Sequence, residues 1–177
     1  MRYKKLIEID IDLLTQCLIR TKDNKIVKTE VKEINTQHYN FKDWEFNWVE
    51  ESKKRNKILG LFAENDKRLQ GIVEYYENKE RQLLEVVLVE IAPFNNRHNP
   101  KNFLKNKEYL GVGGHLFAEI ARISFEKGYD GYVSFLAKTN LIEHYKKTLG
   151  AKQLSYIEMY IDDEAAMKLV KKYYGKN

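Results

Sequence analysis

The chain has 177 residues, of which 43% are hydrophobic and 32% charged, and this composition excludes a disordered or membrane-spanning protein. Cys17 is the single cysteine, so a disulfide within the chain and a cysteine-based metal site are excluded as well. The formal net charge of +5 permits anionic partners, but the basic residues are spread along the sequence, and a solvated basic surface also explains them.

Acidic side chains interrupt the beginning of the sequence. Glu8, Asp10 and Asp12 break the apolar stretch in residues 1–14, which argues against a signal peptide or a membrane span there. With one cysteine and no linker-like segment, we expect a single domain over residues 1–177, a cytoplasmic location and no membrane association.

The next segments alternate between strand and helix patterns. Residues 25–34 are β-branched and alternate in polarity, which predicts a half-buried strand. Residues 41–54 carry Trp44 and Trp48 at helical spacing, with Asn40 as the expected N-cap. Three strands joined by short polar turns are predicted over residues 57–64, 69–77 and 83–92. Such a succession predicts an antiparallel meander.

A glycine-rich turn, Leu110-Gly111-Val112-Gly113-Gly114, follows the third of these strands and opens a helix that ends near Gly128. Such a turn directs backbone N–H groups and the positive end of the helix dipole at one point, which suits a phosphate or pyrophosphate. Glycine allows close approach and a positive φ. The alternative is a strand-to-helix turn that needs glycine only for packing.

The last third of the chain continues the alternation. The further elements predicted are a strand over 129–137, a helix opening at Thr139 and Asn140 and closed by Gly150, a strand over 151–161 and a helix over 162–174. The helix between strands 83–92 and 129–137 makes that pair parallel. The expected fold is α/β, or an α+β mixed sheet: an antiparallel meander followed by a βαβ unit, with helices flanking a central sheet.

Taken in order, these segments resemble the GCN5-related N-acetyltransferase (GNAT) superfamily. Ile91-Ala92-Pro93 corresponds to the strand end of the family pattern, the turn at residues 111–114 to its pyrophosphate loop, and residues 144–151 to its later helix. The resemblance spans residues 57–161. It implies acetyl-CoA as cosubstrate, no metal, and transfer of the acetyl group to a primary amine. It also implies that the pantetheine arm lies in a wedge between strands 83–92 and 129–137.

The resemblance implies a set of cofactor-binding residues. They are Ile91, Leu110, Gly111, Val112, Gly113, Gly114 and Asn140. Backbone around Ile91 would bond to pantetheine, and the amides of 110–114 would hold the pyrophosphate. For Asn140 an N-cap role, with Glu143 completing a capping box, is an equally good explanation.

Two catalytic residues are also implied. Tyr145 resembles the family's general acid, which returns a proton to the CoA thiolate, although an aromatic residue on the apolar face of a helix is a common structural feature. Glu85, six residues before Ile91, takes the place of the general base in histone-type relatives. A solvent-facing glutamate is the alternative, and Glu90, on the other face of the strand, or a chain of waters are further candidates for the base.

The sequence departs from the family pattern at three points. Glu108 occupies an Arg/Gln position near the phosphates, residues 94–109 form a long basic insertion, and Tyr145 lies one position further from Gly150 than is common. The insertion could reach the 3′-phosphate of CoA, gate an acceptor groove, or be a solvated loop. These departures keep open a non-catalytic CoA-binding or interaction protein on the same fold.

The acceptor is a small-molecule or protein amine of unidentified structure. Aromatic residues in the segment 39–49 form either its groove or part of the core. No motif supports nucleic-acid binding, although aminoacyl-tRNA stays open as an acceptor. A homodimer is compatible with the resemblance. The four histidines lack metal-ligand spacing, so no metal site is expected, and His115 is expected to be partly exposed at the helix start.

Overall fold

The computed structural model describes residues 6–9, 11, 14–15, 17–102 and 105–175. The strands of its main sheet, in spatial order, are β3 (Thr29–Glu33), β4 (Lys57–Ala63), β5 (Leu69–Asn78), β6 (Leu83–Ile91), β8 (Val133–Leu136), β10 (Glu158–Ile161) and β9 (Lys152–Gln153). A small second sheet contains β2 (Lys25–Val27), β1 (Leu18–Arg20) and β7 (Tyr109–Leu110).

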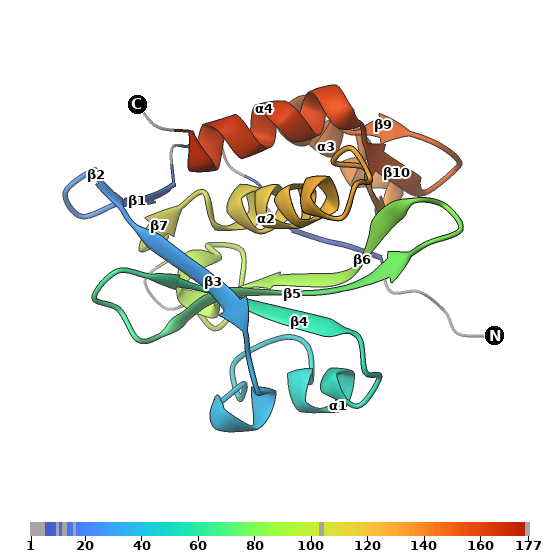
Figure 1. Ribbon diagram of the computed structural model, residues 1–177. Coiled ribbons are helices and arrows are strands. Elements are labelled where there is room, and N and C mark those ends of the chain that lie inside the picture. Colours follow the sequence, from blue (N-terminus) through green and yellow to red (C-terminus); the bar gives the residue numbers. More distant parts are fainter. Residues whose placement is uncertain (1–5, 10, 12–13, 16, 103–104, 176–177) are drawn as a thin grey trace.

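Helices cover both faces of the main sheet (Figure 1). The α-helices are α1 (Trp48–Ser52), α2 (Val112–Glu126), α3 (Ile142–Leu149) and α4 (Asp163–Tyr174), and the short 3₁₀ helices are η1 (Thr36–His38), η2 (Pro93–Asn95) and η3 (Thr139–Leu141). The α1 helix lies below the sheet in this view, and the other three α-helices lie above it.

The central strands contribute to a separate apolar core on each face of the sheet. Leu59 and Leu61 of β4 join the larger core around α2, whereas Ile58 and Phe62 join a smaller core around Trp48. Because both faces are covered, these strands have apolar residues at nearly every position. Burying a side chain of this size contributes about 1.5–3 kcal/mol to the free energy of folding.

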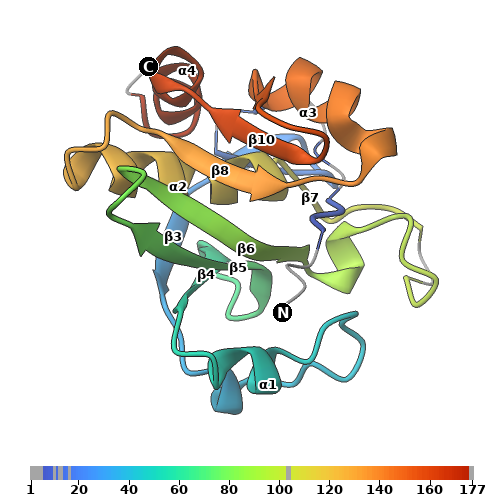
Figure 2. The same ribbon diagram turned by 90° about the vertical axis from the view of Figure 1, so that its right-hand side faces the viewer.

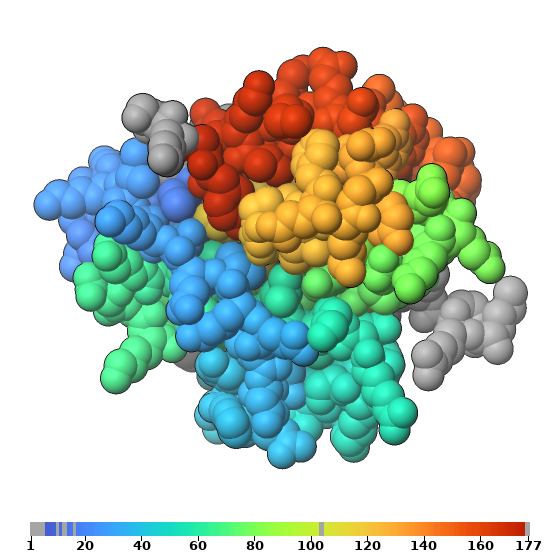
Figure 3. All heavy atoms as spheres, in the orientation of Figure 1, coloured from blue at the N-terminus to red at the C-terminus, as the bar shows by residue number. Residues whose placement is uncertain are grey.

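The α4 helix packs along α2 and closes the larger core. Asp162 caps its first turn, because its side chain accepts a hydrogen bond from the N–H of Ala165 at 2.9 Å. Acidic residues in the first turn and lysines in the last complement the helix dipole. In the space-filling view, α4 (red) lies over α2 (Figure 3).

The structure confirms the expected mixed sheet with flanking helices. The antiparallel meander is β4–β5–β6, and the βαβ unit is β6–α2–β8 with its two strands parallel. The predicted helix over 162–174 is also present. Among the described residues, no helix has the length and apolar character needed to cross a membrane.

Three predicted strands differ from the structure. The segment 25–34 is split at Lys28, since β2 pairs with β1 in the small sheet and β3 pairs with β4 in the main one. The segment 151–161 forms a hairpin of β9 and β10, and the strand expected over 129–137 begins only at Val133. Alternating polarity identifies extended backbone but carries no information about which partner each part pairs with.

The helix predicted over 41–54 is reduced to the five residues of α1. Its N-cap is Asn47, whose side chain accepts from the N–H of Glu50 at 3.2 Å, while Asn40 accepts from Lys42 in an earlier turn. The aromatic residues before α1 line the smaller core from irregular backbone. Packing of these aromatic side chains against the smaller core therefore outweighed the helical preference that their spacing indicated.

Candidate functional site

The two parallel strands of the βαβ unit separate soon after they meet. Their ladder contains two residue pairs, Leu84 with Val133 and Glu85 with Ser134. Directly after it, β6 carries an extra residue, because Glu74 and Tyr75 of β5 pair with Leu88 and Val86 and so skip Val87. A bulge bends and twists the strand that contains it. The sheet consequently opens between the carboxyl ends of β6 and β8 (Figure 2).

The bulge also corrects the predicted faces of β6. Without it, Glu85 and Glu90 would lie on opposite faces. The extra residue shifts the alternation, so Leu84, Val89 and Ile91 all face the larger core. Glu85 and Glu90 therefore share the other face, on which Leu88 meets the core around Trp48.

A segment near the beginning of the chain lies inside the opening. We call the described residues between 6 and 17 the N-terminal segment. The N–H of Ile7 donates to the carbonyl oxygen of Leu136 at 2.7 Å, and Ile7 forms a parallel bridge with Ala137. The N–H of Ala137 donates to the carbonyl oxygen of Ile157, just before β10, at 2.8 Å. The carbonyl of Leu136 belongs to the same peptide unit and therefore points the other way, toward β6.

Tyr145 binds this segment. Its side chain is completely buried, and its hydroxyl accepts from the N–H of Ile9 at 3.0 Å and lies 3.3 Å from the carbonyl oxygen of Ile7, to which it can donate. Its neighbour His144 accepts from the N–H of Ile11 through Nε2 at 3.2 Å. Both α3 side chains thus hold backbone of the N-terminal segment beside the opening.

The glycine turn lies under the same segment. Gly111 is the N-cap of α2 with φ of +88°, and a Cβ built on it would lie 2.1 Å from Oγ1 of Thr15. A Cβ on Gly113 would lie 2.9 Å from Cδ1 of Ile9. Residues 111–114 are all buried. Glycine is therefore required here for close approach by the protein's own chain in this conformation.

Substitution of Gly111 tests this close contact. Gly111→Ala is expected to lower the free energy of unfolding by about 2–4 kcal/mol, because it combines an unfavourable positive φ with a clash against Thr15. Gly128→Ala is the matched control, since Gly128 has φ of +80° and no atom within 4 Å of a built Cβ. It should cost only about 1 kcal/mol. Equal losses in urea unfolding would contradict the contact.

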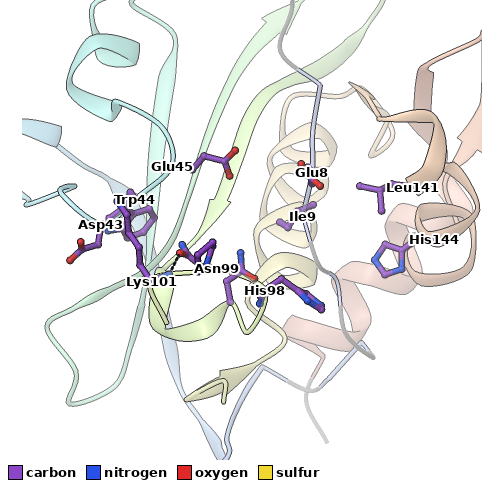
Figure 4. Close-up of a pocket in the computed structure, with 12 residues that line it drawn as sticks. Glu8, Ile9, Asp43, Trp44, Glu45, His98, Asn99, Lys101, Leu141 and His144 are labelled. Carbon is purple, nitrogen blue, oxygen red and sulfur yellow. Dashed lines mark hydrogen bonds between the residues drawn. The ribbon is translucent and has the colours of Figure 1, made fainter. Parts of the chain in front are cut away.

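A cavity of about 580 Å³ opens beside the N-terminal segment. Figure 4 shows Glu8 and Ile9 in the middle of its lining, with Trp44 and Glu45 on one side and His144 on the other. The remaining lining residues are Asp43, Asn96, His98, Asn99, Pro100, Lys101 and Leu141. Residues 96–101 of the insertion therefore contribute to a wall of this cavity.

Glu90 fixes the wall that carries Trp44 and Glu45. Its carboxylate accepts from the N–H of Glu45 at 2.6 Å, from the N–H of Phe46 at 3.3 Å and from Nε1 of Trp48 at 2.7 Å. Burial raises the pKa of Glu90, and the hydrogen bonds from Glu45, Trp48 and Phe46 partly oppose this rise. Glu90 thus connects the end of β6 to the irregular segment before α1.

Glu85 lies near the other end of β6 from Glu90. It accepts from Nδ2 of Asn78 at 2.6 Å and pairs with Arg81 at 3.3 Å, at the end of β6 where the two parallel strands are still paired. Ile91 is six residues further along β6, about 20 Å at the usual strand rise. The structure therefore separates Glu85 from the open end of β6.

The other predicted site residues are distributed as follows. The N–H of Ala92 donates to Gln70 of β5 at 2.9 Å, so the backbone groups of Ile91 point away from β5, toward the opening. Asn140 is exposed within η3, and the cap of α3 is Leu141, which makes no side-chain cap bond. Glu108 turns away from the glycine turn and pairs with Arg68 at 2.6 Å.

His115 corrects the expectation of a partly exposed side chain. It is completely buried between rings of Tyr173 and Tyr174, at centroid distances of 4.9 and 5.2 Å. Its Nε2 lies 3.2 Å from Oγ1 of Thr29, and burial lowers its pKa to about 3. His115 is a neutral core residue beneath the helix start.

The sequence reasoning did not anticipate the N-terminal segment, the bulge at Val87 or the cavity. The alternation Ile7-Glu8-Ile9 was a usable signal, since a period of two predicts a strand. The described residues contain no group of three or more histidine, cysteine, aspartate or glutamate side chains arranged to hold a metal ion.

Comparison with known proteins gives a likeness of fold. No family model matches the chain, and no curated protein matches it in sequence. A bacterial toxin of known structure superposes with a TM-score of 0.54 at 12% identity, over 86% of this chain and 100% of the toxin chain. A Bacillus subtilis acetyltransferase, solved in complex with CoA, gives a TM-score of 0.47 at 15% identity, over 77% and 98%. Identities this low concern architecture alone, and a TM-score below 0.5 does not establish even that.

Proposed function

We propose that this protein is an acetyltransferase of the GNAT type, which moves the acetyl group of acetyl-CoA to a primary amine. The observation that carries the proposal is the opening between β6 and β8, with a glycine-capped helix beginning at its end. At such an opening the backbone groups of Ile91 would face an extended ligand that lies between the strands. A helix N-terminus beside it suits the diphosphate of that ligand.

The proposed reaction is direct transfer. The amine nitrogen attacks the thioester carbon, a C–N bond forms, the C–S bond breaks and CoA leaves as a thiolate. The ammonium proton goes to a base, and Tyr145 gives its hydroxyl proton to the thiolate. The position of Glu85 favours Glu90 or a water chain at the open end as the base. Holding both substrates in one place supplies most of the acceleration.

The cavity supports a cationic acceptor. On the wall before α1, Asp43 and Glu45 bring two carboxylates to a lining that has one lysine, Lys101, and Trp44 brings an aromatic face. Carboxylates attract an alkylammonium group, and an indole ring adds a cation–π contact of about 0.5–2 kcal/mol. A small-molecule amine or a lysine side chain of a protein fits this chemistry.

A second function is supported by a specific observation. The N-terminal segment lies where the pantetheine arm is proposed to bind, and Tyr145 uses its hydroxyl to hold it. In a non-catalytic interaction protein with the same fold, the N-terminal segment would fill the opening between β6 and β8 permanently.

Release of CoA thiol separates the two functions. The full chain is incubated with acetyl-CoA and a panel of polyamines, aminoglycosides and lysine peptides, and binding of CoA is followed by titration calorimetry. Acetyl transfer predicts thiol release that depends on one amine class. Absence of CoA binding at millimolar concentration would exclude the acetyltransferase and leave the interaction protein.

A matched pair of variants locates the acceptor. Glu45→Gln removes a carboxylate from the cavity and is expected to raise the KM for the amine about tenfold without changing CoA binding. Glu50→Gln is the control, since Glu50 is an exposed residue of α1 that pairs with Lys53. Equal KM values for the two variants would exclude the cavity as the acceptor site.

A further inference from the structure

We infer that the N-terminal segment is a displaceable strap that keeps the cofactor groove closed, so that the protein is autoinhibited until CoA or another factor moves it. The inference rests on the proposed function, because it concerns access to the same groove. It makes the closed arrangement a regulated state and not a permanent one.

The first argument is that the segment and the cofactor require the same space. The bond from Ile7 to Leu136 occupies a backbone carbonyl that faces the opening between β6 and β8. Further along, Ile9 lies against Gly113, and Thr15 lies against Gly111. These contacts place the segment over the helix start that the proposed diphosphate would use. Closed segment and bound CoA therefore exclude each other.

The second argument is that the observed hydrogen bonds come from one wall. The N–H groups of the segment bond to β8 through Leu136 and to α3 through His144 and Tyr145. Glu8 pairs with Lys138, directly after β8, and this pair is exposed. Release of the bonds from Ile7, Ile9 and Ile11 leaves the strand pairing of the main sheet intact.

The third argument is the packing of the segment. Ile7, Ile9 and Ile11 are buried, whereas Glu8 between them is exposed. Such alternation belongs to a strand, and Ile7 forms a parallel bridge with Ala137. The described residues of the segment thus place three apolar side chains against the groove, a surface that the pantetheine arm would cover when the segment leaves.

CoA binds only molecules in which the segment has left the groove. The apparent affinity for CoA therefore falls as the fraction of molecules with the segment in place rises. Weakening the closed state must raise that affinity. Ile9→Ala removes the side chain that lies against Gly113 and leaves the groove walls unchanged. The control is Ile161→Ala, which truncates an equally buried isoleucine of the same core in β10.

The experiment is calorimetric titration of CoA into the unmodified 177-residue chain and these two variants. We expect the apparent affinity to rise about tenfold in Ile9→Ala and to stay within twofold of the unmodified chain in Ile161→Ala. Equal affinities in all three proteins would overturn the strap and leave the proposed function standing. Binding in none of them would remove the proposed function, and the segment would then be a permanent strand.

Hydrogen exchange provides a second readout that needs no substitution. The amide of Ile7 donates to Leu136 and that of Ile9 donates to Tyr145, so both are expected to be protected from exchange in the free protein. With saturating CoA they are expected to exchange at least tenfold faster. The amide of Tyr160 in β10 serves as the internal reference. Protection of Ile7 and Ile9 that persists with CoA bound would overturn the inference.

Discussion

Glu90→Ala is expected to lower the free energy of unfolding by about 3–5 kcal/mol, a large part of the stability of a domain this size. Three donors, from Glu45, Phe46 and Trp48, lose their acceptor at once. The indole of Trp48 is completely buried, so its N–H loses its acceptor at a site shielded from bulk solvent. Urea unfolding followed by tryptophan fluorescence measures the loss.

The stability lost on Glu90→Ala is expected to change with pH in a defined direction. Because burial raises the pKa of Glu90, the folded state retains a proton that the unfolded chain has released. The contribution of Glu90 is therefore full below the ordinary glutamate pKa and decreases as the pH rises through the raised value. The stability difference from Glu90→Ala should accordingly be larger at pH 5 than at pH 8.

The control for this prediction is Glu50→Ala. Glu50 lies on α1 close to the same wall, but its pair with Lys53 is exposed, and exposed pairs contribute at most about 1 kcal/mol. A loss below about 1 kcal/mol in Glu90→Ala would contradict the structure, since it would mean that the wall before α1 does not depend on this carboxylate.

Tyr145→Phe is expected to reduce the turnover of acetyl transfer by about 10²- to 10⁴-fold and, at the same time, to strengthen the binding of CoA. Loss of the general acid lowers the rate. Loss of the same hydroxyl removes its bonds to Ile9 and Ile7, so the closed state weakens. Few substitutions affect rate and cofactor affinity in opposite directions, and that pair of signs tests both roles of Tyr145.

Steady-state kinetics and calorimetry together check the prediction. Tyr129→Phe is the control, because its hydroxyl donates to Glu77 at 2.6 Å on a different part of the surface. That variant should retain both parameters. Unchanged turnover in Tyr145→Phe would exclude the general acid, and weaker binding of CoA would contradict its role in holding the segment.

Local patterns predicted the regular part of the fold well. Continuous apolar runs identified β4, β5 and β6, and the glycine turn with its apolar stripe identified α2. Caps and charges at the ends identified α4. These features follow from interactions between residues close in sequence, so the chain shows them before it folds.

The candidate site was predictable only in part. The sequence indicated the glycine turn and the tyrosine on the apolar face of α3, and the family resemblance implied the wedge between the parallel strands. It did not indicate that β6 contains an extra residue at Val87, and the faces of Glu85 and Glu90 were assigned wrongly for that reason. A bulge depends on the partner strand, which lies outside any local window.

The order of the elements and the glycine-capped helix start can be read from the residues, because periodicity and turn chemistry are local properties. What lies over that helix start depends on contacts between distant parts of the chain. Residues separated by more than one hundred positions, such as Ile9 and Tyr145, meet there, and which distant segment fills an opening is settled by competition among long-range contacts.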